Sequence, residues 1–128
     1  MFEKIEMMRM ARAMGHHVAQ RQIVTARNIA NADTPGYKAQ DLKPFEDSYR
    51  HGTDAPAMRV SHPRHLAFDG RPAVTEAVTE QAQASPNGNT VSLETEMVRA
   101  AEVKRQHDLS IGIYRSALTL MRSSLGRR

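Results

Sequence analysis

The N-terminal part of the chain carries apolar residues at intervals of three or four positions. These apolar positions are Met7, Ala11, Met14 and Val18, followed by Ile23, Ala26, Ile29 and Ala30. Such spacing places the side chains along one stripe of an α-helix, and the stripe drifts slowly around the helix towards its end. Because no proline interrupts the stretch, the pattern predicts one long amphipathic helix over residues 3–31.

A second apolar pattern follows Ser92 and is spaced more strictly. Its positions alternate by four and three residues: Leu93, Met97, Ala100, Lys104, His107, Ile111, Tyr114, Leu118, Met121 and Leu125. A seven-residue repeat sustained over this length is typical of a coiled-coil seam. We expect Ser92 to cap the start of this helix and Gly126 to end it, which gives a helix within residues 92–126.

Lys104 and His107 are polar residues in the middle of this apolar seam. They could be exposed positions beside a slightly rotated stripe. Alternatively, they could set the register or the choice of partner, as polar residues in a coiled-coil seam can do. The sequence leaves both interpretations open.

The stretch 26–41, A-R-N-I-A-N-A-D-T-P-G-Y-K-A-Q-D, stops the first helix abruptly. Asn31 and Asp33 favour helix ends because their short side chains bond to nearby backbone groups. Pro35 and Gly36 fit the two central positions of a type II turn, in which the glycine supplies a positive φ. We therefore expect a joint at which the helix ends and the chain turns outward.

The middle of the chain, residues 33–91, is polar and rich in proline and glycine, and we expect it to be mostly irregular. A short helix can follow Pro44, because proline suits the first helical position. Met58–Val60 and Ala73–Thr75 are short strands at most.

These patterns together predict a mainly α fold: two long terminal helices packed as an antiparallel coiled-coil-like pair and joined by the irregular middle. We divide this single domain into residues 1–32, 33–91 and 92–128. Charge favours the antiparallel arrangement, since it places Arg21 and Arg27 near the acidic first half of the C-terminal helix. The expected helix-packing residues are Met7, Met14, Val18, Ile29, Leu93, Met97, Ile111, Tyr114, Leu118, Met121 and Leu125.

Both helices also carry apolar residues outside these stripes. They are Ile5, Met8, Met10 and, where the stripe has drifted, Ile23 in the first helix, and Leu109, Ile113 and Leu120 in the second. A pair of helices buries one seam and leaves the other faces in water. The sequence therefore predicts a subunit of a larger assembly.

Charge and composition restrict the alternatives. The net charge of +4 allows a basic helical nucleic-acid-binding module, but the basic residues are dispersed, which disfavours it. The chain has no cysteine, so it can form neither a disulfide nor a thiolate metal site. No apolar run is long enough for a membrane span, and the charged N-terminal stretch does not read as a cleavable signal peptide.

Catalytic and metal-binding patterns are also missing from the sequence. There is no nucleophile elbow and no glycine-rich phosphate loop. His16 and His17 diverge by about 100° on a helix and cannot bind one metal together. His62 and His65 are separated by two residues but flank Pro63, without an acidic third ligand nearby. We expect no enzymatic activity, no metal and no cofactor.

Two strings in this chain resemble the flagellar axial protein family, which includes rod and hook subunits. The first is Asn28–Lys38, N-I-A-N-A-D-T-P-G-Y-K, which follows the long N-terminal helix. The second is Gly88–Val91, G-N-T-V, which leads into the C-terminal helix. The continuation Ala39–Asp41 is most similar to the proximal rod subunits. This chain departs from the family at Val103 and His107, where an asparagine and then an aromatic residue are frequent.

The resemblance implies a structural subunit of the bacterial flagellar proximal rod, which assembles helically and transmits torque through the periplasm. In such a subunit the two terminal helices form the inner tube. The implied partners are copies of itself, other rod proteins, membrane-ring and rod-adapter proteins, and the flagellar type III export apparatus, without nucleic acid. A companion proximal rod protein is the alternative. The turn-motif residues that the resemblance singles out are Asn28, Asn31, Asp33, Thr34, Pro35, Gly36 and Tyr37.

Overall fold

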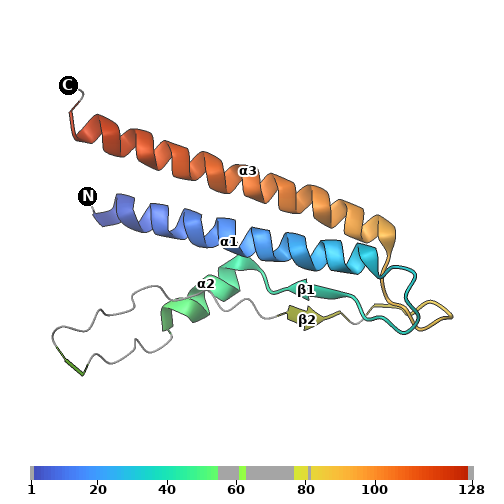
Figure 1. Cartoon of the computed structure of the whole chain (residues 1–128). Helices are drawn as coiled ribbons and strands as arrows, with labels where there is room; N and C mark the ends of the chain where they lie inside the picture. The colour runs from blue at the N-terminus through green and yellow to red at the C-terminus, as the bar shows by residue number, and fades with distance from the viewer. Residues whose placement is uncertain (1, 55–60, 63–76, 81, 127–128) are drawn as a thin grey trace.

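Two long helices dominate the computed structural model (Figure 1). The structure describes residues 2–54, 61–62, 77–80 and 82–126. The elements, in chain order, are α1 (Phe2–Ala30), β1 (Gln40–Leu42), α2 (Phe45–Asp54), β2 (Ala77–Thr79) and α3 (Leu93–Ser124). The predicted mainly α fold is confirmed. The strands suggested at Met58–Val60 and Ala73–Thr75 lie outside the described residues, as does His65.

The two long helices are antiparallel, as predicted. Figure 1 shows α1 and α3 side by side, with both chain ends at the same end of the pair. Ser92 is the N-cap of α3, and its Oγ accepts a hydrogen bond from the backbone N–H of Thr95. At the other end, Gly126 has a φ of +76°, the left-handed conformation that commonly follows the last helical residues.

Small and polar side chains form the contact line between the helices. On α3 the buried residues recur every seven positions: Glu96, Val103, Ser110 and Ala117. On α1 the matching buried positions are Ala11, Val18 and Thr25. A Cβ placed on Gly15 would lie 3.5 Å from the Oγ of Ser110, so these helices approach closely in the middle of the pair.

The seam predicted for α3 needs a correction. One position after the observed contact line come Met97, Ile111 and Leu118, and Leu125 comes seven positions after Leu118. One position along an α-helix is a rotation of about 100°, so the predicted seam lies about 100° around α3 from the observed contact line. Leu93, Met97 and Leu125 are 44%, 63% and 75% exposed, instead of buried against α1. Ile111, Tyr114, Leu118 and Met121 are half-buried at the side of the contact.

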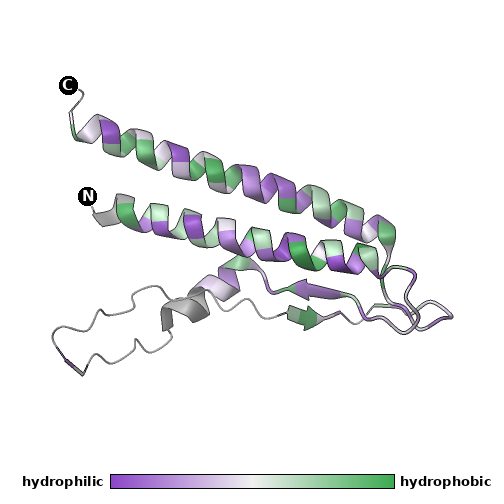
Figure 2. Cartoon of the chain, viewed as in Figure 1, coloured by the Kyte–Doolittle hydropathy of each residue, from purple (hydrophilic) through white to green (hydrophobic). Residues whose placement is uncertain are grey.

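The first helix shows the same kind of difference. Val18 is buried and Met14 is half-buried, whereas Met7 and Ile29 are exposed, contrary to their predicted packing. Figure 2 shows hydrophobic residues distributed around both helices instead of gathered only where they touch. The two helices therefore leave much apolar surface for other contacts.

A small layer of strands lies along α1 (Figure 1). β1 and β2 are antiparallel, with Gln40 opposite Thr79 and Leu42 opposite Ala77. Leu42 of β1 and Ala39, which directly precedes this strand, are buried. The helix predicted after Pro44 is present as α2, and the backbone N–H of Ser48 donates to the carbonyl of Pro44. β2 was not predicted, because this part of the chain read as irregular.

Candidate functional site

The helix α1 ends in a compact joint, which we define as residues 28–40 together with residues 85–92. The backbone N–H of Asn31 donates to the carbonyls of Arg27 and Asn28, and its side-chain amide donates to Arg27 at 2.8 Å. Thr34 Oγ1 in turn donates to the Asn31 side-chain oxygen. These bonds satisfy carbonyl groups that a helix end would otherwise leave without partners.

The predicted turn at Pro35 and Gly36 is present. Gly36 has a φ of +72°, and the backbone N–H of Tyr37 donates to the carbonyl of Thr34 across the turn. The backbone N–H of Gly36 also donates to the carbonyl of Asn87, on the second segment of the joint.

The two segments of the joint meet at Gly36 and Gly88. Gly88 has a φ of +78°, and a Cβ there would lie 3.5 Å from the Cα of Gly36. The two strings that resemble the flagellar axial proteins are therefore in direct contact, although they are far apart in sequence. At 3.5 Å such a Cβ would be in ordinary van der Waals contact, so it is the positive φ of Gly88 that favours glycine at this position.

Asn89 caps the end of α1, although it lies more than fifty positions later in the sequence. Its side chain is 2% exposed, and its amide nitrogen lies 2.7–2.9 Å from the carbonyl oxygens of Asn31, Ala32 and Thr34. Its side-chain oxygen accepts from the backbone N–H of Val91. One buried side chain thus holds the end of α1 against the approach to α3.

Asn28 has the corresponding role on the first segment. It is fully buried, its amide donates to the carbonyl of Gln40 at 2.7 Å, and its oxygen accepts from the Tyr37 hydroxyl and the Gln40 backbone N–H. Thr90 completes the joint, because its hydroxyl accepts from the backbone N–H of Ala39 and its own N–H donates to Tyr37.

The structure thus divides the predicted turn-motif residues into two groups. Asn28, Asn31, Thr34, Gly36 and Tyr37 all bond within the joint, whereas Asp33 and Pro35 are exposed at its surface. The roles of Asn89 and Thr90 in the joint were not predicted from the sequence. The signal was present in the G-N-T-V string, but the three carbonyls that Asn89 meets belong to a segment more than fifty positions away.

A cluster of charged side chains ties the helices to the strands. This charge cluster consists of Arg21 on α1, Asp41 on β1, Glu80 after β2, and Glu96 and Arg99 on α3. Arg21 binds Asp41 through two hydrogen bonds of 2.8 and 2.9 Å. Arg99 binds Glu96 at 2.8 Å, contacts Glu80, and places its Nε 3.8 Å from Asp41. Arg21 therefore forms its ion pair with β1, while Glu102 in the acidic first half of α3 also acts on it electrostatically.

Ionisation within the charge cluster follows from these contacts. Burial alone would raise the pKa of Asp41, but the hydrogen bonds from Arg21 and from the backbone N–H of Leu42 outweigh it, and the pKa is lowered. The hydrogen bond to Asp41 raises the pKa of Arg21, and Glu102 on α3 adds to the effect. Burial acts to lower the pKa of Arg99, but Glu80 and Glu96 reverse this and raise it. The cluster is therefore held in its charged form.

His17 is buried where α1 meets α2. It is 2% exposed, its Nε2–H donates to the carbonyl of Lys43 at 2.9 Å, and its ring packs edge-on against Phe45. Nδ1 is buried and has no hydrogen-bond partner within the described residues. Burial lowers the pKa of His17, and Arg21 adds to this, against the opposing effects of the Lys43 carbonyl and Asp41.

Acidification is expected to destabilise the protein through His17. Because the folded pKa lies below the unfolded value of about 6.5, the stabilisation is complete above that value and is lost as the pH falls through the folded pKa. Protonation would also give Nδ1 a hydrogen without an acceptor. In urea unfolding between pH 7 and pH 5, His17→Gln should show a smaller decrease in free energy of unfolding than the wild type. The exposed neighbour is the matched control: His16→Gln should keep the wild-type pH dependence, and equal slopes for all three proteins would contradict the assignment.

The described part of the chain contains no group of three or more histidine, aspartate or glutamate side chains that could hold a metal ion. Across the same residues, neither long helix is apolar enough over a sufficient length to cross a membrane. What the structure does offer is a rigid helix pair, a joint that locks its two segments together, and exposed apolar surface.

The fold and the joint define a class of protein, namely mainly helical proteins in which two long terminal helices pair and a joint of two distant segments links their ends. The family model described as "Flagella basal body rod protein" matches residues 18–38, which cover the second half of α1 and the turn. The chain is 30% identical to the flagellar basal body rod protein FlgB of Agrobacterium fabrum, over 98% of this chain and 96% of that protein. It is 35% identical to FlgB of Escherichia coli K12, over 73% of both chains, and 33% identical to FlgB of Salmonella typhimurium, over 84% and 83%.

The chain therefore belongs to the FlgB family of flagellar basal body rod proteins. It is a structural subunit of the rod, located in the flagellar basal body, where it assembles with other rod proteins. The family match includes residues 28–38, which make up most of the first segment of the joint.

Proposed function

We propose that this chain is a subunit of the proximal rod, where it packs helically against copies of itself and other rod proteins and transmits torque across the periplasm. The observation that carries the proposal is the apolar surface exposed on the described helices. The exposed residues are Ile5, Met7, Met10, Ile23, Ile29, Leu93, Met97, Val98, Leu109, Leu120 and Leu125. Apolar surface spread over both helices and around them is expected of a subunit that neighbours surround.

The joint and the charge cluster support a role in carrying torque. A subunit that transmits a twisting load must resist sliding of one helix against the other. Arg99 connects α3 to both strands, Arg21 connects α1 to β1, and Asn89 connects the end of α1 to the start of α3. These polar links have defined directions, unlike apolar contacts, and so they oppose sliding of the helices.

The same proposal includes delivery and neighbours. We infer export through the flagellar type III apparatus, and contacts with membrane-ring and rod-adapter proteins at the base of the rod. Membership of the rod family supports this inference.

Deletion of the gene tests the proposal. Electron microscopy of the deletion strain should show membrane rings without rods or hooks, and the cells should be non-motile. Expression of the chain from a plasmid should restore rods, hooks and swimming. Motile deletion cells with complete filaments would overturn the proposal.

A further inference from the structure

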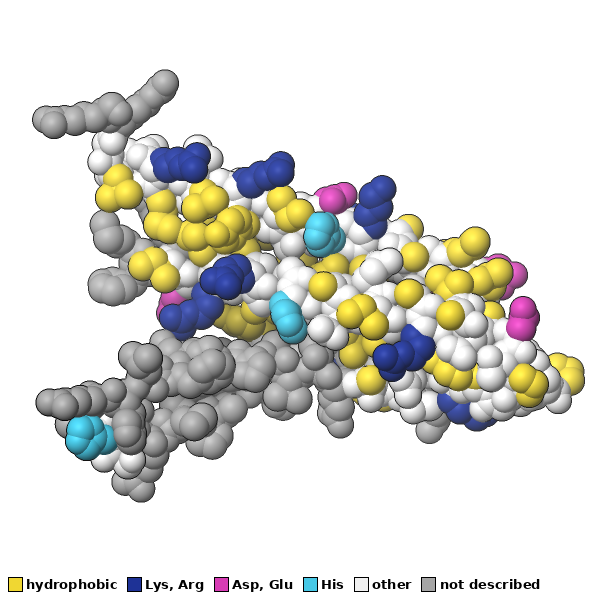
Figure 3. Space-filling model, in the orientation of Figure 1, with side chains coloured by type: hydrophobic (Ala, Val, Ile, Leu, Met, Phe, Trp, Pro, Cys, Tyr) yellow, Lys and Arg dark blue, Asp and Glu magenta, His cyan; other side chains and the backbone are white. Residues whose placement is uncertain are grey.

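A groove runs along one face of the α1–α3 pair. One hollow of about 570 Å³ is lined by Val18, Ala19, Gln22, Ile23, Ala100, Val103, Lys104 and His107. A second, of about 400 Å³, is lined by Ala11, Arg12, Gly15, His107, Ser110, Ile111 and Tyr114. The two hollows share His107 and so form one continuous groove. Figure 3 shows hydrophobic side chains along and between the two helices on this face.

The side of the groove that α3 forms carries a coiled-coil-like apolar repeat that does not pack against α1. Met97, Lys104, Ile111, Leu118 and Leu125 repeat every seven residues, one position after the line that contacts α1. The outermost of them, Met97 and Leu125, are the most exposed large apolar residues of this seam. A seven-residue apolar repeat accepts another helix through knobs-into-holes packing. The occupant that fits the groove is therefore an α-helix.

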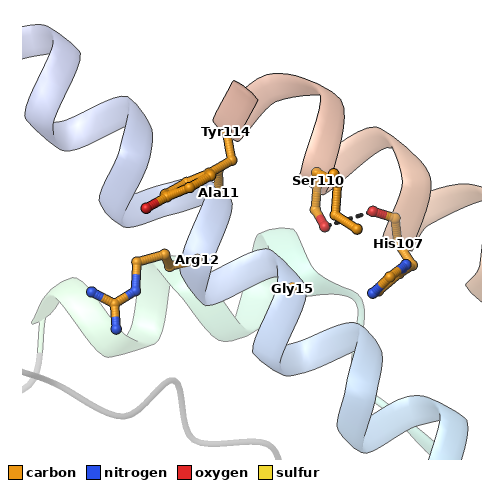
Figure 4. A pocket seen from close by; sticks show the side chains of 7 residues that line it. Ala11, Arg12, Gly15, His107, Ser110 and Tyr114 are labelled. Carbon is orange, nitrogen blue, oxygen red and sulfur yellow. Dashed lines mark hydrogen bonds between the residues drawn. The ribbon is translucent and has the colours of Figure 1, made fainter. Parts of the chain in front are cut away.

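The centre of the groove is polar and positively charged. Figure 4 shows the His107 ring directed from α3 towards α1 near Gly15, with Tyr114 lying over Ala11 and Arg12 extending away from α3. No acidic residue lines either hollow. Within the described part of the chain, Lys104 forms neither an ion pair nor a side-chain hydrogen bond. His107 lies 3.8 Å from Asp108, which is exposed beside the groove.

This charge makes a second copy of the seam an unfavourable occupant. Two α3 seams that face each other would bring two Lys104 ammonium groups and two His107 rings into the same central stretch. Like charges at such positions select against a pairing, and an opposite charge selects for it. The favoured helix carries a carboxylate where this seam carries Lys104.

We propose that the groove binds an amphipathic helix of another rod protein, with a seven-residue apolar repeat interrupted near its middle by aspartate or glutamate. This inference rests on the proposed function as a rod subunit. It assigns Lys104 and His107 to partner choice, one of the two interpretations that the sequence left open. The apolar halves of the groove provide affinity, and the central charge provides specificity.

Two synthetic helical peptides with the same apolar repeat test the proposal. One carries glutamate at its two central seam positions and the other carries lysine there. In fluorescence anisotropy at low salt, the full chain should bind the glutamate peptide at least about tenfold more tightly. Lys104→Glu should remove or reverse this preference. Arg105→Glu makes the same charge change one residue away, on the exposed side of α3, and should leave it unchanged.

A preference that survives Lys104→Glu, equal binding of the two peptides, or binding of neither would overturn the inference. The same variants are also compared in cells that lack the gene, where assembly of the rod itself is the readout. There Lys104→Glu should reduce swimming and rod formation, whereas Arg105→Glu should support both, and equal performance would again overturn it. Failure of the wild-type chain to restore rods would instead overturn the rod proposal. The peptide-binding experiment would then still test whether the groove binds an acidic helix.

Discussion

Replacement of Arg99 by methionine should lower the free energy of unfolding by about 3 kcal/mol, because it leaves a buried carboxylate without its partner. The Glu96 side chain is 2% exposed, and Arg99 is its only ion-pair partner within the described residues. One oxygen of Glu96 already has no hydrogen-bond partner there. The same change also removes the contacts of Arg99 with Glu80 and Asp41. The Glu80 side chain is partly exposed, so its contact contributes less to stability. Urea unfolding followed by circular dichroism measures the effect.

A double variant separates the buried charge from the loss of packing. Arg99→Met combined with Glu96→Met removes both charges, and such a replacement of a buried ion pair by apolar residues is often close to neutral. The double variant should therefore recover most of the lost stability. Arg105→Met, an exposed arginine of the same helix, is the matched control and should change stability by less than about 0.5 kcal/mol. A loss below about 1 kcal/mol for Arg99→Met would contradict a structural role for the cluster.

This charge cluster also explains why the predicted seam of α3 was rotated. Pattern analysis assigns apolar residues to the buried side, and by that rule Met97 belonged inside and Glu96 outside. Glu96 read as an acidic residue of the first helical turn, where it would favour the positive end of the helix. The predicted seven-residue repeat was correct, but contacts with the strands decide which row of α3 residues with this repeat faces α1. Arg99 binds Glu96 on its own helix and reaches Asp41 and Glu80 beside the strands, and these contacts are made with α3 turned away from its apolar seam.

Local chemistry made the ends of the helices and the turn predictable. Ser92, Pro35, Gly36 and Gly126 each act on their own neighbours along the chain, and each has the predicted role. β2 could not be predicted in the same way. All three of its residues are exposed, so no alternation of buried and exposed side chains marks the strand. Backbone pairing with β1 creates it, and pairing between distant segments leaves no periodic signal in a single sequence.

The joint combines predictable and unpredictable parts. Its first segment is held by residues that are close together in sequence, whereas Asn89, which caps it, is distant in sequence. Asn31 and Gly36 follow from rules for helix ends and turns. Asn89 follows from no such rule, because its importance depends on the three carbonyls that it meets in space. The resemblance to flagellar axial proteins paired the two strings without giving a physical reason. The structure supplies that reason: the second string provides the donor that the end of the first helix lacks.

Replacement of Asn89 by alanine should therefore destabilise the protein by about 2–3 kcal/mol, since each buried polar group left without a partner costs on the order of 1–3 kcal/mol. The carbonyls of Asn31, Ala32 and Thr34 would lose a donor at 2.7–2.9 Å, and the cavity at this buried position would add to the loss. Urea unfolding gives the overall effect. Hydrogen exchange at the amides of Gly36 and Thr90, which bond across the joint, should show that the loosening begins there.

Asn89→Asp tests whether the donor or merely the shape of the side chain matters. Aspartate has nearly the same shape as asparagine, but its ionised carboxylate only accepts hydrogen bonds. At neutral pH it would face three carbonyl oxygens at the negative end of α1, so it should destabilise the protein more than alanine does. Asn31→Ala removes two exposed side-chain hydrogen bonds, one to the Arg27 carbonyl and one from the Thr34 hydroxyl, and should cost less than Asn89→Ala, about 1 kcal/mol. If Asn89→Asp were as stable as the wild type, the joint would depend on packing alone, and Asn89 would not be the group that links the two ends of the chain.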